Sequence, residues 1–338
     1  MKKGLVIIGL TIILSIFIYW VSRDTIVFNS LPTENEITED LIGSDIEPLK
    51  EITPDFVVMT FAGDVMMDRG VESSVNKNFK GNYNALFENV DIFSLDDISF
   101  VNLEGPVSDV GHNVGSKYSF RMDPSVISVL KNSGVDIVSF ANNHVGDYSL
   151  PAFKDTLQRL SAGDLLFTGA GENYANVREP IVIEKNNIKT CFLGFSDVGP
   201  NWMKAGENTP GILIASDPNF IEIIQSAKTK CDVLAVSFHW GEEYKKHNVR
   251  QETLAHKAID SGADIIVGAH PHVAQDIEIY KGKPIMYSLG NFMFDQYFSE
   301  ATMQGLVVQL KAFKSGEIKE IKEYTSKQNK LFQIESIL

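Results

Sequence analysis

The alternation of short apolar runs with longer amphipathic segments, which begins near residue 55, is the feature that most restricts the fold of this chain. The apolar runs occupy residues 56–61, 98–103, 136–141, 191–195, 233–238, 264–268 and 284–289. Helical spacing is found over 126–130, 150–160 and 250–261, and a hairpin over 306–324. Strands that are apolar throughout and separated by helices predict an α/β fold with helices covering the sheet.

The N-terminus carries a different signal, because two lysines precede an apolar run from Gly4 to Val21. About 18 helical residues span about 27 Å, enough to cross the hydrocarbon core of a bilayer. Tyr19 and Trp20 stand where a cleavage site would need small residues. We therefore expect residues 1–23 to be an uncleaved, single-pass transmembrane anchor rather than a cleaved signal peptide. The lysines place the rest of the chain on the extracytoplasmic face of the cell membrane.

The remaining domain boundaries follow from composition. Residues 24–54 are acidic, contain prolines and have no hydrophobic period, which is typical of a solvated spacer. The folded domain is predicted over 55–325, followed by a C-terminal tail over 326–338. The net charge of −14 argues against nucleic acid as a partner, but it does not argue against a metal ion.

The two cysteines, Cys191 and Cys231, do not form a Cys-x-x-Cys motif. Thiolate zinc sites and dithiol redox motifs are therefore not expected. Both residues lie in apolar surroundings, and we interpret them as two small buried hydrophobic residues in preference to a disulfide.

Polar residues follow the predicted strands at their carboxyl ends. They are Asp64, Asn102, Glu104, Asn142, Asn143, His144, His239, His270 and His272. Because ligands of open α/β sheets bind at that edge, residues distant in sequence are expected to converge there. Carboxylate, amide and imidazole groups without thiolates suit a divalent ion such as Mn, Fe, Zn or Mg.

Each of these residues also has a structural interpretation when taken alone. Asp64 could cap a helix, Asn142 and Asn143 could be turn residues, and His239 could be a hydrogen-bonded core histidine. The pair His270 and His272 is the least easily explained in that way, since a proline between them makes a stiff chelating unit. His112, His247 and His256 have no comparable setting and are interpreted as surface or packing residues.

Taken together and in order, the motifs resemble those of the bacterial capsule-synthesis CapA family, which acts in poly-γ-glutamate biosynthesis. The motifs are Phe61-Ala62-Gly63-Asp64-Val65-Met66, Asn102-Leu103-Glu104-Gly105-Pro106, Ala141-Asn142-Asn143-His144, His239-Trp240-Gly241-Glu242-Glu243-Tyr244, Gly268-Ala269-His270-Pro271-His272-Val273 and Tyr287-Ser288-Leu289-Gly290-Asn291-Phe292. That family in turn resembles the calcineurin-like metallophosphatases. The resemblance implies a metallophosphatase-like layered sheet sandwich flanked by helices.

The resemblance also implies roles for individual residues. Glu104, Asn143, His239 and His270 would hold one metal ion, and Asp64, Glu104 and His272 would hold another. His144, with Asp64, would be catalytic and would protonate a leaving group or steady a phosphoryl oxygen. Met66 stands where the phosphatase pattern has histidine, so one site would be well formed and a second would lack a ligand.

Further residues are predicted to serve this site. Arg69, Lys117 and Arg121 could grip a carboxylate or phosphate, with Asn102 and Asn142 beside them, although the same cations could belong to a solvated loop. Glu242 and Glu243 could orient a metal-bound histidine.

Two functions are compatible with these predictions. The first is a membrane-anchored metal-dependent hydrolase that cleaves a phosphoester or a polymer amide bond. The second is a non-catalytic subunit of a polymer synthase or export complex, which would bind an anionic polymer such as poly-γ-glutamate together with other capsule synthase subunits.

Overall fold

The computed structural model describes residues 54–338. The predicted anchor over 1–23 and residues 24–53 of the spacer predicted over 24–54 lie outside the described residues. Among the helices of residues 54–338, none is both long enough and apolar enough to cross a bilayer.

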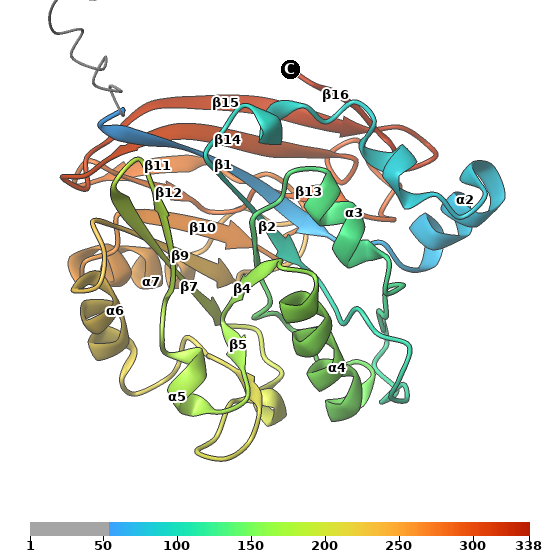
Figure 1. The fold of residues 1–338 in the computed structure, drawn as a ribbon, viewed down its shortest axis with the longest axis horizontal. Coiled ribbons are helices and arrows are strands. Elements are labelled where there is room, and N and C mark those ends of the chain that lie inside the picture. The colour runs from blue at the N-terminus through green and yellow to red at the C-terminus, as the bar shows by residue number, and fades with distance from the viewer. Residues whose placement is uncertain (1–53) are drawn as a thin grey trace, which may run out of the picture. The chain divides into compact units, whose positions relative to one another are not determined.

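The first of two large sheets begins with β1 (Phe56–Val65), which lies at its centre (Figure 1). On one side β1 pairs in parallel with β2 (Ile98–Leu103), followed by β3 (Ile137–Ser139) and β4 (Leu166–Thr168). On the other side an antiparallel extension consists of β14 (Gln304–Phe313), β15 (Ile318–Gln328) and β16 (Ile334–Ile337). The short β13 (Asn291–Met293) pairs with the end of β1.

The second sheet has a parallel centre and antiparallel edges. Its order is β11 (Ile277–Tyr280), β12 (Lys283–Met286), β10 (Ile265–Ala269), β9 (Val233–His239), β7 (Ile188–Ser196) and β6 (Ile181–Lys185). A further two-stranded ladder joins β5 (Ala170–Gly171) and β8 (Gly211–Ile212).

Three layers of apolar side chains hold these elements together. The middle layer lies between the two sheets and joins Met59, Phe61 and Phe100 to Phe192 and Val267. An outer layer packs the first sheet against α2 (Arg69–Phe79), α3 (Val126–Asn132) and α4 (Ser149–Ala162). The other packs the second sheet against α5 (Tyr174–Val177), α6 (Phe220–Lys228) and α7 (Val249–Asp260). Short 3-10 helices occur at Tyr83–Phe87, Ile92–Ser94 and Asn201–Met203.

The predicted α/β class, with stacked sheets flanked by helices, is confirmed, and the predicted hairpin is β14–β15. Residues 326–338, predicted as a tail, contain the end of β15 and the whole of β16 at the sheet edge.

The interpretation of the cysteines is wrong. Cys191 on β7 and Cys231 after α6 form a disulfide, with their Cα atoms 5.8 Å apart. Helix α6 brings the chain back beside β7, so Cys191 and Cys231, which are 40 positions apart in sequence, meet in space.

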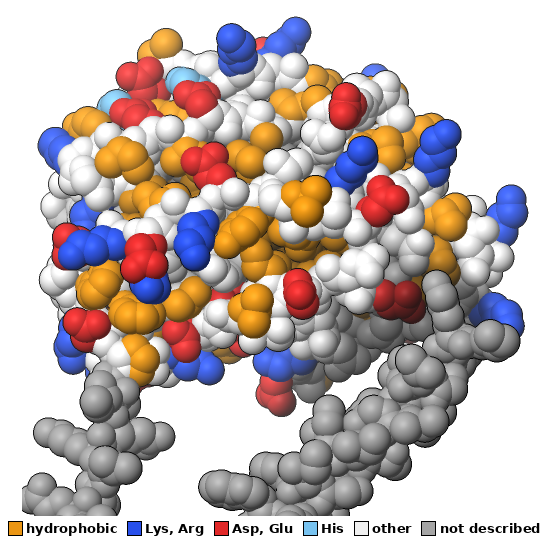
Figure 2. Space-filling model, turned by 90° about the horizontal axis from the view of Figure 1, so that it is seen from above, with side chains coloured by type: hydrophobic (Ala, Val, Ile, Leu, Met, Phe, Trp, Pro, Cys, Tyr) orange, Lys and Arg blue, Asp and Glu red, His pale blue; other side chains and the backbone are white. Residues whose placement is uncertain are grey.

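Figure 2 shows the molecule from above, turned by 90° from the view of Figure 1. On the described part of this face, lysine and arginine side chains alternate with acidic and hydrophobic ones instead of gathering into a basic area.

Candidate metal centre

The carboxyl ends of four parallel strands bring the predicted site residues together. Asp64 is on β1, Asn102 is the last residue but one of β2, His239 ends β9, and His270 and His272 follow β10. The arrowheads of these strands point to the same side of the molecule (Figure 1). All five side chains are buried, so the sequence-distant motifs form one cluster between the two sheets.

Asp64 is placed by a close backbone crossing. Its N–H donates to the carbonyl of Gly290 at 2.9 Å, and a Cβ on the preceding Gly63 would lie 1.9 Å from the same oxygen. Glycine is therefore required before Asp64. The Asp64 carboxylate accepts from Asn102 Nδ2 at 2.8 Å and from the backbone N–H of His270 at 3.3 Å.

Glu104 is fully buried and incompletely paired. Its Oε2 accepts from Asn102 Nδ2 at 3.3 Å, whereas its Oε1 has no hydrogen-bond partner within residues 54–338. Oε1 faces His272 Nε2 at 3.6 Å and His144 Nε2 at 3.7 Å. Burial, and next the charge of Asp64, raise the pKa of Glu104 well above its usual value. A buried carboxylate in this position is costly unless a cation neutralises it.

Two histidines of the cluster, His239 and His270, are held as neutral imidazoles. Burial lowers the pKa of His239 well below its usual value, and the adjacent His270 acts in the same direction. Burial, followed by the charge of His272, lowers the pKa of His270 to about 3. His239 contacts Asn143 Oδ1 at 2.7 Å through Nε2, while Nδ1 of His270 has no partner. Neutral imidazole is the form that coordinates a metal ion.

The turn that carries His270 and His272 has an unusual backbone. Both residues have a positive backbone φ, 97° for His270 and 57° for His272, which residues with a Cβ rarely adopt. Such strain is tolerated when the surrounding structure fixes it, and it is concentrated at functional sites. Nδ1 of His272 lies 3.0 Å from Asn291 Oδ1 and 3.4 Å from Asp64 Oδ2.

His144 is oriented by a residue that sequence reasoning did not select. Its Nδ1 lies 2.7 Å from Oδ2 of Asp147, which also accepts from the backbone N–H of Phe120. The Phe120 ring lies 4.0 Å from the imidazole, centroid to centroid. Asp147 follows His144 by three residues in a turn, where its N–H donates to the His144 carbonyl at 3.1 Å, and no helical spacing in the sequence singled it out. Asn291 was also not predicted as a site residue, although it lies in the motif Tyr287-Ser288-Leu289-Gly290-Asn291-Phe292.

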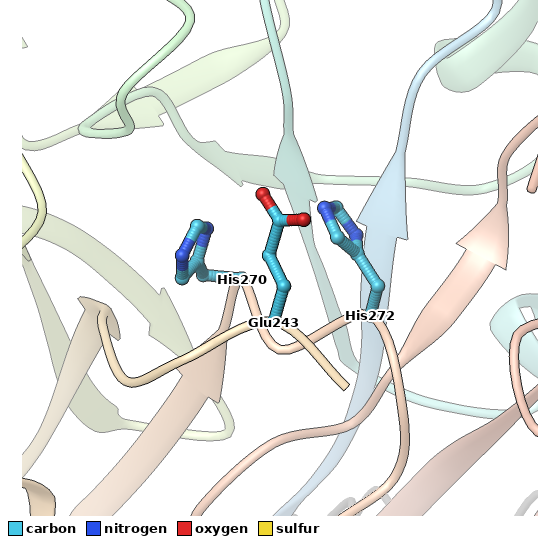
Figure 3. A group of neighbouring side chains, drawn as sticks. All are labelled: Glu243, His270 and His272. Carbon is cyan, nitrogen blue, oxygen red and sulfur yellow. The ribbon is translucent and has the colours of Figure 1, made fainter. Parts of the chain in front are cut away.

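The other predicted residues occupy varied positions. Asn142 is a buried turn residue, since its side chain donates to the Leu103 carbonyl at 2.8 Å and accepts from the His144 N–H at 3.1 Å. Glu242 is exposed, and His239 contacts Asn102 and Asn143 instead. Glu243 is exposed and lies with His270 and His272, their ligand atoms within 4.8 Å of one another (Figure 3).

A pocket of about 250 Å³ opens beside these residues. It is lined by Arg69, Tyr118, Phe120, His144, Glu243, Tyr244, His272, Asp295, Gln296 and Phe298. Arg69 pairs with Asp295 through two nitrogens, so its charge is already matched. Lys117 and Arg121 are outside this lining. Lys117 contacts the Tyr118 ring, and Arg121 stacks on Tyr148 at 4.3 Å.

The donor set fits a divalent cation. Among the described residues, the buried polar atoms without a partner include Asn102 Oδ1, Glu104 Oε1 and His270 Nδ1, all three in this cluster. Two sets of ligand atoms are close enough to hold an ion, Asp64–Glu104–His272 and Glu243–His270–His272. Oxygen and imidazole donors without thiolate suit Mn, Fe, Zn or Mg.

Comparison with known proteins gives the family. Residues 58–296 match the sequence profile described as "Bacterial capsule synthesis protein PGA_cap". The chain belongs to this family of capsule synthesis proteins. It is 37% identical over 273 residues to the "PGA biosynthesis protein CapA" of Bacillus subtilis, covering 79% of this chain and 71% of that protein. It is 34% identical to the "Capsule biosynthesis protein CapA" of Bacillus anthracis, covering 78% of this chain and 66% of that protein. The resemblance found in the motifs is thereby confirmed.

Solved structures are more distantly similar. A hypothetical protein from Thermus thermophilus has a TM-score of 0.49 at 16% identity, covering 80% of this PGA_cap member and 100% of that chain. The calcineurin-like phosphoesterase YfkN from Bacillus subtilis has a TM-score of 0.43 at 15% identity, covering 80% and 91%. Likeness of this degree carries no inference about activity.

Proposed function

We propose that this protein is a membrane-anchored, extracytoplasmic, metal-dependent hydrolase that acts in capsule biosynthesis. The substrate bond would be a phosphoester or a polymer amide, and poly-γ-glutamate is the candidate polymer. The capsule and PGA biosynthesis names of its Bacillus relatives support the biological role. Partners would be the membrane, the anionic polymer and other capsule synthase subunits.

The observation that carries the proposal is the set of unpartnered, buried ligand atoms around Glu104. Folded proteins pair nearly all buried polar atoms, so a cluster of exceptions on oxygen and imidazole donors indicates a cation-binding site. We assign Glu104, Asn143, His239 and His270 to the first ion. Asp64, Glu104 and His272 flank a second position.

When bound, a divalent cation supplies Lewis-acid polarisation of a phosphoryl or carbonyl oxygen. The residues of the chain position the substrate and move the proton. His144 presents Nε2 towards Glu104 and the pocket, while Asp147 fixes the ring through Nδ1. We therefore assign His144 as the group that protonates the leaving atom.

The location outside the cytoplasm is supported by the disulfide between Cys191 and Cys231, because disulfides persist mainly in oxidising compartments. The apolar run over 4–21 supports anchoring in the membrane.

The test is an assay of the full chain with added Mn²⁺ on poly-γ-glutamate and on a phosphodiester. His144→Ala should lower turnover by about 10²–10⁴-fold with bound metal unchanged, and His239→Ala should lose metal and turnover together. His112→Ala, at an exposed histidine, is the matched control. Turnover that survives in both site variants would contradict the assignment.

A second candidate is a non-catalytic subunit that binds polymer through the metal. It is favoured by Met66, which packs with Phe120 and Phe294 in an apolar cluster at the position of the absent histidine. Stoichiometric metal and bound polymer, without turnover of either substrate, would establish this function instead.

A further inference from the structure

The second metal position lacks a ligand in the first motif. Met66 is fully buried and contributes its side chain to the cluster with Phe120 and Phe294. The ligand atoms that remain at this position belong to Asp64, Glu104 and His272. Three protein ligands leave the coordination shell of a hard divalent ion incomplete.

Glu243 lies where a further ligand could complete this position. It follows β9 on the loop opposite the His270–His272 turn, and Figure 3 shows its carboxylate between the two imidazole rings, with the three side chains pointing to the same side. A ligand atom from each of the three lies within 4.8 Å of the others. Its charge also reaches Glu104, whose pKa is raised by burial, by Asp64 and then by Glu243.

The loop is fixed in a way that presents this carboxylate. The Tyr244 N–H donates to the Pro271 carbonyl at 2.8 Å, which ties the loop directly to the turn between the two histidines. The Tyr244 hydroxyl accepts from Gln296 Nε2 at 3.0 Å. On the other side, Gly241 has φ of 86° and packs against Gln251, where a Cβ would meet that side chain at 2.7 Å. Glu243 is therefore held over the site by contacts on both sides.

Two independent observations point to an ion at this place. Glu104 Oε1 and His270 Nδ1 are buried and unpartnered among the described residues; His270 belongs to the group of Glu243, and Glu104 belongs to the group that shares His272 with it. Three carboxylates, from Asp64, Glu104 and Glu243, meet around His272, while the nearby Arg69 is already paired with Asp295. A cation bound here would offset the repulsion between these like charges.

We propose that Glu243 is a metal ligand that replaces the absent first-motif histidine and completes a second ion position with Asp64, Glu104 and His272. This inference rests on the proposed function, because it assumes that the first position holds an ion. Glu243 is exposed and lines the pocket, so it is also the ligand that an entering anionic group of the substrate would displace.

The test is the Mn²⁺ stoichiometry of the full chain, measured by elemental mass spectrometry after equilibration with Mn²⁺ and desalting. The wild type should hold two ions and Glu243→Gln one. Glu242→Gln is the matched control, because it removes the adjacent exposed charge and should keep two ions. Circular dichroism of each variant without metal shows whether the fold is retained.

The outcomes separate this inference from the proposed function. Equal stoichiometry in the wild type and Glu243→Gln overturns the role of Glu243, whether that number is two or one. One ion in the wild type and none in the variant would place Glu243 on the first position and would also overturn the assignment. A wild type without any Mn²⁺ would contradict the proposed function itself.

Discussion

Acidic side chains lie at both ends of the parallel strands, and their surroundings differ. At the amino ends, an aspartate precedes each of β2, β3, β9 and β10 and accepts a hydrogen bond from a backbone N–H of the neighbouring strand, at 2.8–3.0 Å. These residues are Asp97, Asp136, Asp232 and Asp264. At the carboxyl ends, Glu104 keeps one oxygen without a partner.

The contrast is sharpest between Asp264 and Glu104, since both are buried. Asp264 also contacts Lys228 and Lys283, each at 2.6 Å, so its charge is matched within the chain. Glu104 faces the carboxylate of Asp64 and the imidazole rings of His144 and His272, and no lysine or arginine is paired with it among the described residues. A buried acid stabilises the fold when the chain provides its hydrogen-bond donors and counter-charges. A buried acid that lacks them, among other converging ligand atoms, indicates a ligand site.

The largest expected effect is that of Asp264→Ala. The variant removes the charged acceptor of two ammonium groups, which keep only a backbone carbonyl each, and the acceptor of the Leu234 N–H, so it should lower the free energy of unfolding by about 3 kcal/mol. Urea unfolding followed by circular dichroism measures this. Asp260→Ala, which breaks an exposed pair with Lys281, should leave stability unchanged. A similar loss in both variants would break the comparison.

A smaller effect is expected at Asp96, the residue before Asp97. Burial raises the pKa of Asp96 to about 7, and the charge of Asp136 acts in the same direction. The unfolded pKa is about 3.9. The folded protein therefore binds this proton more tightly, and the stability it contributes, full below about pH 4, is lost as pH rises through 7.

Asp96→Asn removes this dependence. From pH 5 to pH 8 the wild type should lose on the order of 1 kcal/mol of unfolding free energy relative to the variant, because the group is partly exposed. Parallel pH profiles for the two proteins would show that Asp96 is already ionised at pH 5. Asp96 also has a buried oxygen without a partner, but it belongs to no group of converging ligand atoms among the described residues, which distinguishes it from Glu104.

Much of the fold could be predicted from the sequence, because the central strands are apolar on both faces. Other elements left signals that were not used. Asn186 and Asn187, both with positive φ, form the turn of the β6–β7 hairpin, and such an Asn pair is a turn signal. Helix α6 carries Phe220, Ile223 and Ala227 at helical spacing.

The site was predicted less completely, because some hydrogen-bond partners of its side chains are recognised only in the three-dimensional structure. The strand ends identified Asp64, Glu104 and the histidines, since parallel strands deliver their carboxyl ends to one edge. The partners Asp147 and Asn291 are recognised by their hydrogen bonds to His144 and His272, which sequence spacing does not specify. The disulfide was missed because its cysteines come from separate elements.

The central claim is that the unpartnered carboxylate at the carboxyl edge binds a cation, and Glu104→Gln tests it most directly. The measurement is the unfolding free energy of wild type and variant, with chelator and with Mn²⁺. Without metal the variant should be at least as stable as the wild type, because the charge beside Asp64 is removed. Mn²⁺ at a hundredfold excess over its dissociation constant should stabilise the wild type alone, by about 2.7 kcal/mol for each ion bound. A variant destabilised like Asp264→Ala, beside a wild type that does not respond to Mn²⁺, would contradict the account.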